Sequence, residues 1–170
     1  VFMSFTKNYT EEEITKINEE VDRIYNSLVN SNNTIKYNIL QIHNYIISNS
    51  RYDSDMISGT SNYNSDRANG PLFEGYAICS GYTDSMQLFL EELGINNYRV
   101  ASEKHTWNAV EIDNTWYHLD LTWDDPITTS GRNVLLHDYF LINDNDLIKL
   151  DMAATKRKHI YNRDIYLEFN

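Results

Sequence analysis

The sequence predicts an α+β domain, in which helices come first and an antiparallel sheet follows. Apolar residues recur at helical spacing over the first half of the chain. Two alternating segments in the second half are joined by Asp113-Asn114, a pair typical of tight hairpin turns. Between these regions, one further helix begins at the single cysteine, Cys79. The 170 residues are enough to bury a core without disulfide bonds.

The first two helices are indicated by their N-terminal residues. Thr10 and Glu13 have the spacing of a capping box, which predicts a helix over about residues 11–29. Thr34 can cap a second helix with an isoleucine stripe. Residues 54–70 are rich in Ser, Asn, Asp and Gly and predict a long surface loop.

The third helix carries Cys79 in its first turn. Its apolar face consists of Tyr82, Met86, Phe89, Leu90 and Leu93, and Gly94 can end the helix. A helix N-terminus offers unpaired N–H groups and a positive dipole end, both of which favour a thiolate. Gly75 and Gly81 flank the cysteine and are expected to allow a substrate backbone to approach. By itself, a lone cysteine is more often an inert, buried apolar residue.

The hairpin register follows from the turn. If Asp113-Asn114 is a two-residue turn, Ile112 faces Thr115 and Trp107 faces Asp120. One face then holds an apolar set suited to a core, namely Val110, Ile112, Tyr117, Leu119 and Leu121, and the other holds His105, Trp107, Ala109, Trp116, His118 and Asp120. His105 and Asp120 become diagonal neighbours with Cα atoms about 7 Å apart. Further strands are expected over residues 98–101, 139–142 and 165–169.

A thiol, an imidazole and a carboxylate are the groups of a cysteine nucleophile with its base and its orienting acid. We assign these roles to Cys79, His105 and Asp120. His118 is the strongest rival for the base, because it lies on the same face of the hairpin but nearer the turn. Other titratable side chains have ordinary interpretations: His43 as a packed or surface residue, His137 and His159 as surface residues, and Asp124 and Asp125 as turn residues before Pro126.

Four aromatic residues near these positions are candidates for substrate binding: Tyr76, Tyr82, Trp107 and Trp123. Tryptophans here could wall a substrate groove or exclude water from an ion pair. For Trp116 and Trp123, simple packing is at least as plausible.

Composition limits the partners. A net charge of −11 argues against nucleic acid and against anionic membrane surfaces. One cysteine excludes an internal disulfide, a cysteine-based zinc site and a resolving thiol for redox chemistry, and we expect no metal and no cofactor. There is no apolar stretch of membrane-spanning length. Because the chain begins at Val1, we expect a piece of a longer multidomain protein, at the cell surface or extracellular.

Three ordered motifs resemble the transglutaminase-like superfamily, and its bacterial branch in particular. They are Gly-x-x-x-Cys-Ser-Gly-Tyr at residues 75–82, His-x-Trp-Asn-x-Val at 105–110, and Trp-Tyr-His-x-Asp-x-Thr-Trp-Asp-Asp-Pro at 116–126. The resemblance extends over roughly residues 35–145. It therefore suggests a helical extension at 1–34 and a catalytic domain at 35–170, packed as one compact unit.

The resemblance implies a papain-like fold and a triad carried onto Cys79, His105 and Asp120. It implies a cysteine enzyme that attacks an amide carbonyl of a protein or peptide and forms a thioester. Water would resolve this thioester in a protease or deamidase, and an amine in a transamidase; we slightly favour water. The alternative is a non-catalytic peptide-binding or scaffolding module of a larger surface protein. The calcium dependence of animal transglutaminases is not carried over, because no ordered calcium-ligand spacing is present.

Overall fold

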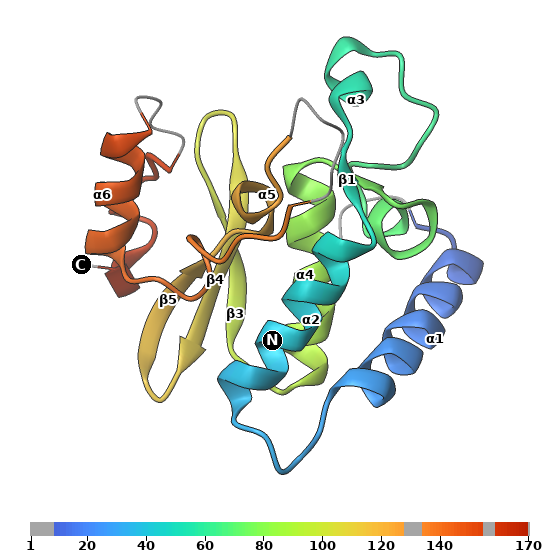
Figure 1. The fold of residues 1–170 in the computed structure, drawn as a ribbon, viewed down its shortest axis with the longest axis horizontal. Coiled ribbons are helices and arrows are strands. Elements are labelled where there is room, and N and C mark those ends of the chain that lie inside the picture. The colour runs from blue at the N-terminus through green and yellow to red at the C-terminus, as the bar shows by residue number, and fades with distance from the viewer. Residues whose placement is uncertain (1–8, 128–133, 155–158, 170) are drawn as a thin grey trace.

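The computed structural model describes residues 9–127, 134–154 and 159–169, and it has the predicted α+β architecture (Figure 1). An antiparallel sheet of order β3-β4-β5 stands at its centre. The strands are β3 (Asn97–Ala101), β4 (Thr106–Ile112) and β5 (Thr115–Leu119). Three helices lie on one side of this sheet: α1 (Glu11–Leu28), α2 (Ile35–Ser48) and α4 (Cys79–Glu92). The other side is covered by α6 (Asp144–Ala153) and the C-terminal segment.

The first helices begin at the residues that the caps predict. The Thr10 hydroxyl accepts a hydrogen bond from the Glu13 N–H at 3.2 Å, and the Glu13 carboxylate accepts one from the Thr10 N–H at 2.8 Å. Thr34 caps α2 in the same way through the N–H of Tyr37. Helix α1 buries an apolar stripe in the main core, so the N-terminal segment packs onto the rest of the domain.

The segment expected to be a surface loop is partly folded. Asp53 caps a short helix, α3 (Ser54–Ser58), and its carboxylate also accepts hydrogen bonds from the hydroxyls of Ser61 and Ser65. A π-helix, η1 (Gly70–Glu74), follows. Strand β1 (Arg51–Tyr52) pairs in parallel with β2 (Tyr76–Ala77), and this pairing brings the two ends of the segment together.

The hairpin register is confirmed. Asp113 and Asn114 have φ angles of 52° and 59°, as a two-residue type I′ turn requires, and Ile112 pairs with Thr115. The ladder between β4 and β5 ends at the pair Asn108–Leu119. Consequently His105 lies one residue before β4, and Asp120 lies one residue after β5.

The two faces of the hairpin belong to two different apolar clusters, as the alternation predicts. The helix-facing cluster includes Val110, Ile112, Leu119 and Leu121, with Tyr117 packed against it. The opposite cluster includes Trp107 and Ala109, with Trp116 packed against it. This second face is not open to a substrate, because Leu147 of α6 and Phe169 near the C-terminus pack onto it.

Two of the predicted strands are wrong. Around Tyr139–Ile142 the chain makes a turn, in which Leu141 has a φ of 49°, and a single bridge joins Ile142 to His118. A left-handed residue interrupts an extended run, which explains the difference. The C-terminal segment contains a 3₁₀ helix, η2 (Leu167–Phe169), and the Phe169 ring stacks on His118 at 3.8 Å between centroids. Within the described ranges, no helix has both the length and the apolar character needed to cross a membrane.

Candidate active site

Cys79 is the first residue of α4, and the preceding chain fixes it there. The N–H of Ile78 donates to the carbonyl of Ser65 at 2.8 Å, and the Ser80 hydroxyl donates to the carbonyl of Asp66 at 2.9 Å. A Cβ on Gly81 would lie 2.2 Å from the Ser65 carbonyl oxygen. Gly81 is therefore needed for the approach of this chain's own backbone, which corrects the expectation that it makes room for a substrate.

His105 lies at the end of the connection from β3 and directly before β4. Its carbonyl accepts a hydrogen bond from the N–H of Ser102 at 2.9 Å, which closes the turn. Nε2 of its ring lies 2.5 Å from Oδ2 of Asp120, which leaves Nδ1 for the thiol of Cys79. The backbone N–H of Thr106, the next residue, also bonds to the Cys79 sulfur.

Asp120 follows β5 directly and caps the short helix α5 (Leu121–Asp124). Its Oδ1 accepts hydrogen bonds from the N–H groups of Thr122 at 2.9 Å and Trp123 at 3.4 Å. The other oxygen, Oδ2, faces His105. A single carboxylate thus starts a helix with one oxygen and orients the histidine with the other.

These contacts produce a polarised chain of groups. Burial alone would raise the pKa of the Cys79 thiol, but the hydrogen bond and charge of His105, together with the Thr106 N–H, lower that pKa overall. Burial opposes a charged His105, yet Asp120 and the Cys79 sulfur raise the pKa of the imidazole to about 10. The pKa of Asp120 is held well below its usual range despite burial, by His105 first and then by His159. The arrangement favours a thiolate beside an imidazolium.

A family model described as "Transglutaminase-like superfamily" matches residues 22–121, which is more than half of the chain. The chain belongs to the transglutaminase-like superfamily. The matched range begins inside α1 and ends just after Asp120, so it contains all three residues of the site.

A solved structure described as a TGase has a similar fold. It superposes with a TM-score of 0.58 at 17% identity, over 69% of this chain and 34% of that one. The present chain therefore spans about a third of that protein's length, and the likeness shows a shared fold. A protein provisionally named a cysteine protease, from Cytophaga hutchinsonii, has a TM-score of 0.47 at 16% identity, over 76% of this chain and 47% of that one. No curated protein matches the sequence significantly. The papain-like, transglutaminase-type α+β fold is confirmed.

In this superfamily member, a histidine that we expected at the surface lies behind the triad. The His159 side chain has 0% exposure, and its Nε2 lies 2.8 Å from Oδ2 of Asp120. Its Nδ1 lies 2.6 Å from Oδ1 of Asp151 on α6. No periodic pattern in the sequence marks His159, and 39 residues separate it from Asp120. The prediction failed because this contact is purely tertiary.

Two further side chains interact electrostatically with the cysteine and were not predicted from the sequence. Burial and the nearby charges of Cys79 and Asp120 raise the pKa of Tyr52 on β1. Arg99 on β3 forms an ion pair with Asp84 of α4. Burial lowers the pKa of Arg99, and the charge of Cys79 opposes this effect.

The candidate substrate-binding aromatics differ in exposure. Trp107 and Tyr82 are each 1% exposed, so we withdraw the expectation that they contact a substrate. The Trp107 indole stacks over His105 with centroids 5.7 Å apart, and the Tyr82 hydroxyl donates to Asp125. Trp123 and Tyr76 are half-buried. Trp123 meets the edge of His105 at 6.5 Å between centroids.

The other histidines have partners that remove them from the triad. His118, the rival base, accepts a hydrogen bond at Nδ1 from the Trp107 indole N–H at 3.0 Å, and burial lowers its pKa to about 4. His43 is fully buried and lies 3.0 Å from Asp124. His137 is exposed, as expected.

Asp124 and Asp125 are not ordinary turn residues. Both are buried, and Asp124 accepts a hydrogen bond from the Tyr139 N–H at 2.9 Å in addition to its contact with His43. Burial raises the pKa of Asp125 to about 6, against the opposing effect of its hydrogen bond with Tyr82.

One group within the described part of the chain has the donor types of a metal site: His105, Asp120 and His159, with ligand atoms within 4.8 Å of one another. Both imidazole nitrogens that face Asp120 lie 2.5 Å and 2.8 Å from the same oxygen. Ligand atoms around an ion at about 2.0–2.1 Å stand farther apart, roughly 3.3 Å in a tetrahedral site. The observed lengths are those of hydrogen bonds, and both nitrogens lie closer to Oδ2 than two ligand atoms of one tetrahedral zinc ion would lie to each other.

Proposed function

We propose that this chain is a cysteine enzyme that transfers the acyl group of a protein or peptide amide. The observation that carries the proposal is the continuous contact from Cys79 through His105 to Asp120, in which the imidazole and carboxylate are 2.5 Å apart. Membership of the transglutaminase-like superfamily supports it. A sealed structural cysteine would not need an imidazole and a backbone N–H beside its sulfur.

The first half-reaction follows from these positions. The Cys79 thiolate attacks the amide carbonyl carbon, a C–S bond forms, and the carbonyl π electrons move to the oxygen. First-turn N–H groups of α4 are placed to hold this oxyanion, because Ile78 at the N-cap position makes no side-chain capping bond. The C–N bond then breaks as His105 gives its proton to the departing nitrogen. The product is a thioester and a free amine or ammonia.

The second half-reaction uses the same groups in reverse. His105, now neutral, takes a proton from the incoming nucleophile as it attacks the thioester carbonyl, and Cys79 leaves as a thiolate. Asp120 fixes the ring orientation in both steps. We favour water as the nucleophile, which gives peptide cleavage or deamidation, and an amine would give transamidation. Cys79, Trp123 and Tyr76 are partly exposed and are the residues that we propose a substrate would meet.

Mass spectrometry of a proteome-derived peptide mixture tests this function. The wild-type chain and Cys79→Ala are each incubated with the mixture, with and without methylamine. Cleaved peptides, glutamine converted to glutamate, or glutamine carrying methylamine would each identify the reaction, provided that the product is absent with Cys79→Ala.

A chemical probe of the thiol complements this experiment. We expect iodoacetamide to alkylate wild-type Cys79 with a pH midpoint below the ordinary cysteine value of about 8.5, and we expect His105→Ala to raise that midpoint. An ordinary midpoint that is insensitive to His105→Ala, together with no Cys79-dependent product in either mixture, would instead support the scaffolding module.

A further inference from the structure

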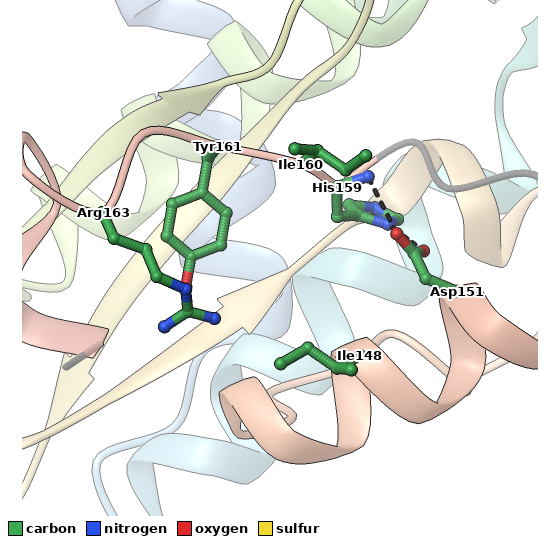
Figure 2. A pocket seen from close by; sticks show the side chains of 6 residues that line it. All are labelled: Ile148, Asp151, His159, Ile160, Tyr161 and Arg163. Carbon is green, nitrogen blue, oxygen red and sulfur yellow. Dashed lines mark hydrogen bonds and ion pairs between the residues drawn. The ribbon is translucent and has the colours of Figure 1, made fainter.

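His159 occupies a position between two carboxylates in the interior. Its Nε2 lies 2.8 Å from Oδ2 of Asp120, its Nδ1 lies 2.6 Å from Oδ1 of Asp151, and its backbone N–H donates to Oδ2 of Asp151 at 3.0 Å. Figure 2 shows the His159 ring and the Asp151 carboxylate pointing toward one another, and both residues line a pocket of about 210 Å³. Asp151 thus clamps His159 through both its backbone and its ring.

The ring is also fixed by its neighbours. It stacks on Tyr139 with centroids 5.3 Å apart and an interplanar angle of 27°. It meets Trp107 edge-on at 4.7 Å and His105 edge-on at 5.2 Å. Titratable groups that face it come from several elements. They are His105 before β4, Asp120 before α5, Tyr139 in the connection that follows, and Asp151 on α6, and His118 on β5 also interacts with it electrostatically. A ring packed in this way cannot swing away from Asp120.

His159 contacts the same oxygen of Asp120 that His105 contacts, namely Oδ2. Oδ2 of Asp120 faces both imidazoles, at 2.5 Å for His105 and 2.8 Å for His159. Its Oδ1 is held by the first turn of α5. Without His159, Oδ2 would keep His105 as its one partner. The carboxylate could then pivot about the hydrogen bonds that Oδ1 accepts from the first turn of α5. With His159, the carboxylate is held from both sides.

We propose that His159, clamped by Asp151, is a positioning residue that holds Asp120 against His105 and so keeps the Cys79–His105 pair poised for attack. This inference rests on the proposed function, since it assigns His159 a part in the same site. It extends the site from three residues to five, and it links the first turn of the cysteine helix to α6 on the far side of the sheet. His159 touches neither the thiol nor a substrate, and it acts through Asp120.

The test follows the pH midpoint of Cys79 alkylation by iodoacetamide in the full chain. His159→Phe keeps an aromatic ring but removes both polar contacts, and we expect the midpoint to rise by about one unit, since the carboxylate that stabilises the imidazolium is no longer held. His159→Gln can still present one N–H to Asp120, so we expect a smaller rise in the same direction. His137→Phe, at an exposed histidine, is the matched control and should leave the midpoint unchanged.

The outcomes separate this inference from the proposed function. If the wild-type midpoint is low and depends on His105, but both His159 variants keep it, the positioning role is overturned and His159 serves packing alone. If the wild-type midpoint is ordinary, His105→Ala does not change it and no Cys79-dependent product forms, the proposed function itself fails. Thermal unfolding of each variant shows whether it is folded. Should His159→Phe not fold, His159→Gln decides, and an unchanged midpoint in that variant counts against the inference.

Discussion

Two buried histidine–aspartate pairs lie at opposite ends of the one-turn helix α5, and they differ in what surrounds the second ring nitrogen. His105 pairs with Asp120 at the start of the helix, and His43 pairs with Asp124 at its end. The free nitrogen of His105 meets the thiol of Cys79, which is partly exposed. That of His43 meets the side-chain oxygen of Asn44 at 3.0 Å.

The difference shows that the pair alone does not make a catalytic site. Both pairs have hydrogen-bond distances and almost no exposure. The His43 ring is enclosed by Phe140 and His137, whereas the His105 ring lies between a buried carboxylate and a sulfur atom that a substrate could reach. We therefore expect the His43–Asp124 pair to contribute stability and the His105–Asp120 pair to contribute chemistry.

The largest expected effect is a difference in catalytic activity between variants of His105 and His43. His105→Ala should lower kcat/KM for whichever product is identified by about 10³-fold or more, because both proton transfers are lost. His43→Ala, measured on the folded fraction, should retain activity within a few fold. Steady-state kinetics on both variants checks this. Comparable losses in the two variants would remove the distinction between the pairs.

The second prediction concerns stability, for which we expect the larger loss in His43→Ala and the smaller loss in His105→Ala. His43→Ala leaves the buried Asp124 side chain with the Tyr139 N–H but without its imidazole hydrogen bond, and it also opens a cavity, so it should lower the free energy of unfolding by about 3 kcal/mol. His105→Ala should cost less, because Asp120 keeps His159 and the Thr122 N–H. Urea unfolding near neutral pH measures both values. A larger loss in His105→Ala would show that the supposed chemical pair is the main structural one.

A third buried histidine, His118, sharpens the comparison by pH, because burial outweighs the effect of its neighbour Asp144, whose Oδ1 lies 3.6 Å from Nε2 of the ring. Burial lowers the pKa of His118 to about 4, so the unfolded chain binds this proton at higher pH than the folded chain does. The stability that His118 contributes is complete above its unfolded pKa of about 6.5 and is lost as the pH falls toward 4, by up to about 3 kcal/mol. Urea unfolding of wild type and His118→Gln across this range checks the slope. Equal slopes in the two proteins would count against it.

The smallest effect concerns a neighbouring carboxylate without a histidine. The pKa of Asp125 is raised to about 6, so the folded state favours the protonated carboxyl, and stability falls as the pH rises from about 4 to 6. The amide oxygen of Asp125→Asn can still accept the hydrogen bond of the Tyr82 hydroxyl, and the variant avoids the buried charge. Above pH 6 we expect it to be more stable than wild type by about 1 kcal/mol, less than the full shift implies because the amide forms a weaker hydrogen bond with Tyr82 than the charged carboxylate does. Thermal unfolding at pH 4 and pH 7 tests this, and an equal difference at both values would contradict it.

Local signals in the sequence were sufficient for the elements that they specify. The capping box at Thr10 and the positive-φ pair Asp113-Asn114 act within a few residues, so the start of α1 and the hairpin register could be predicted. The register then placed His105 and Asp120 side by side. Family motifs covered the same residues.

The parts that could not be predicted depend on contacts between distant segments. His159 and Asp151 meet Asp120 only because α6 and the following chain cover the outer face of the sheet. The same covering buries Trp107, which the sequence had suggested as a candidate for substrate binding. A left-handed residue at Leu141 has no sequence signature comparable to a glycine, so the turn there resembled a strand.

The double use of Asp120 has a consequence for how relatives of this chain should be interpreted. Because its Oδ1 starts α5, the carboxylate is needed for folding whether or not any reaction takes place. A descendant that lost its nucleophile would still be under selection to keep this aspartate. Its presence in a related sequence is therefore weak evidence of an active enzyme, and the residue aligned with Cys79 is the more informative marker.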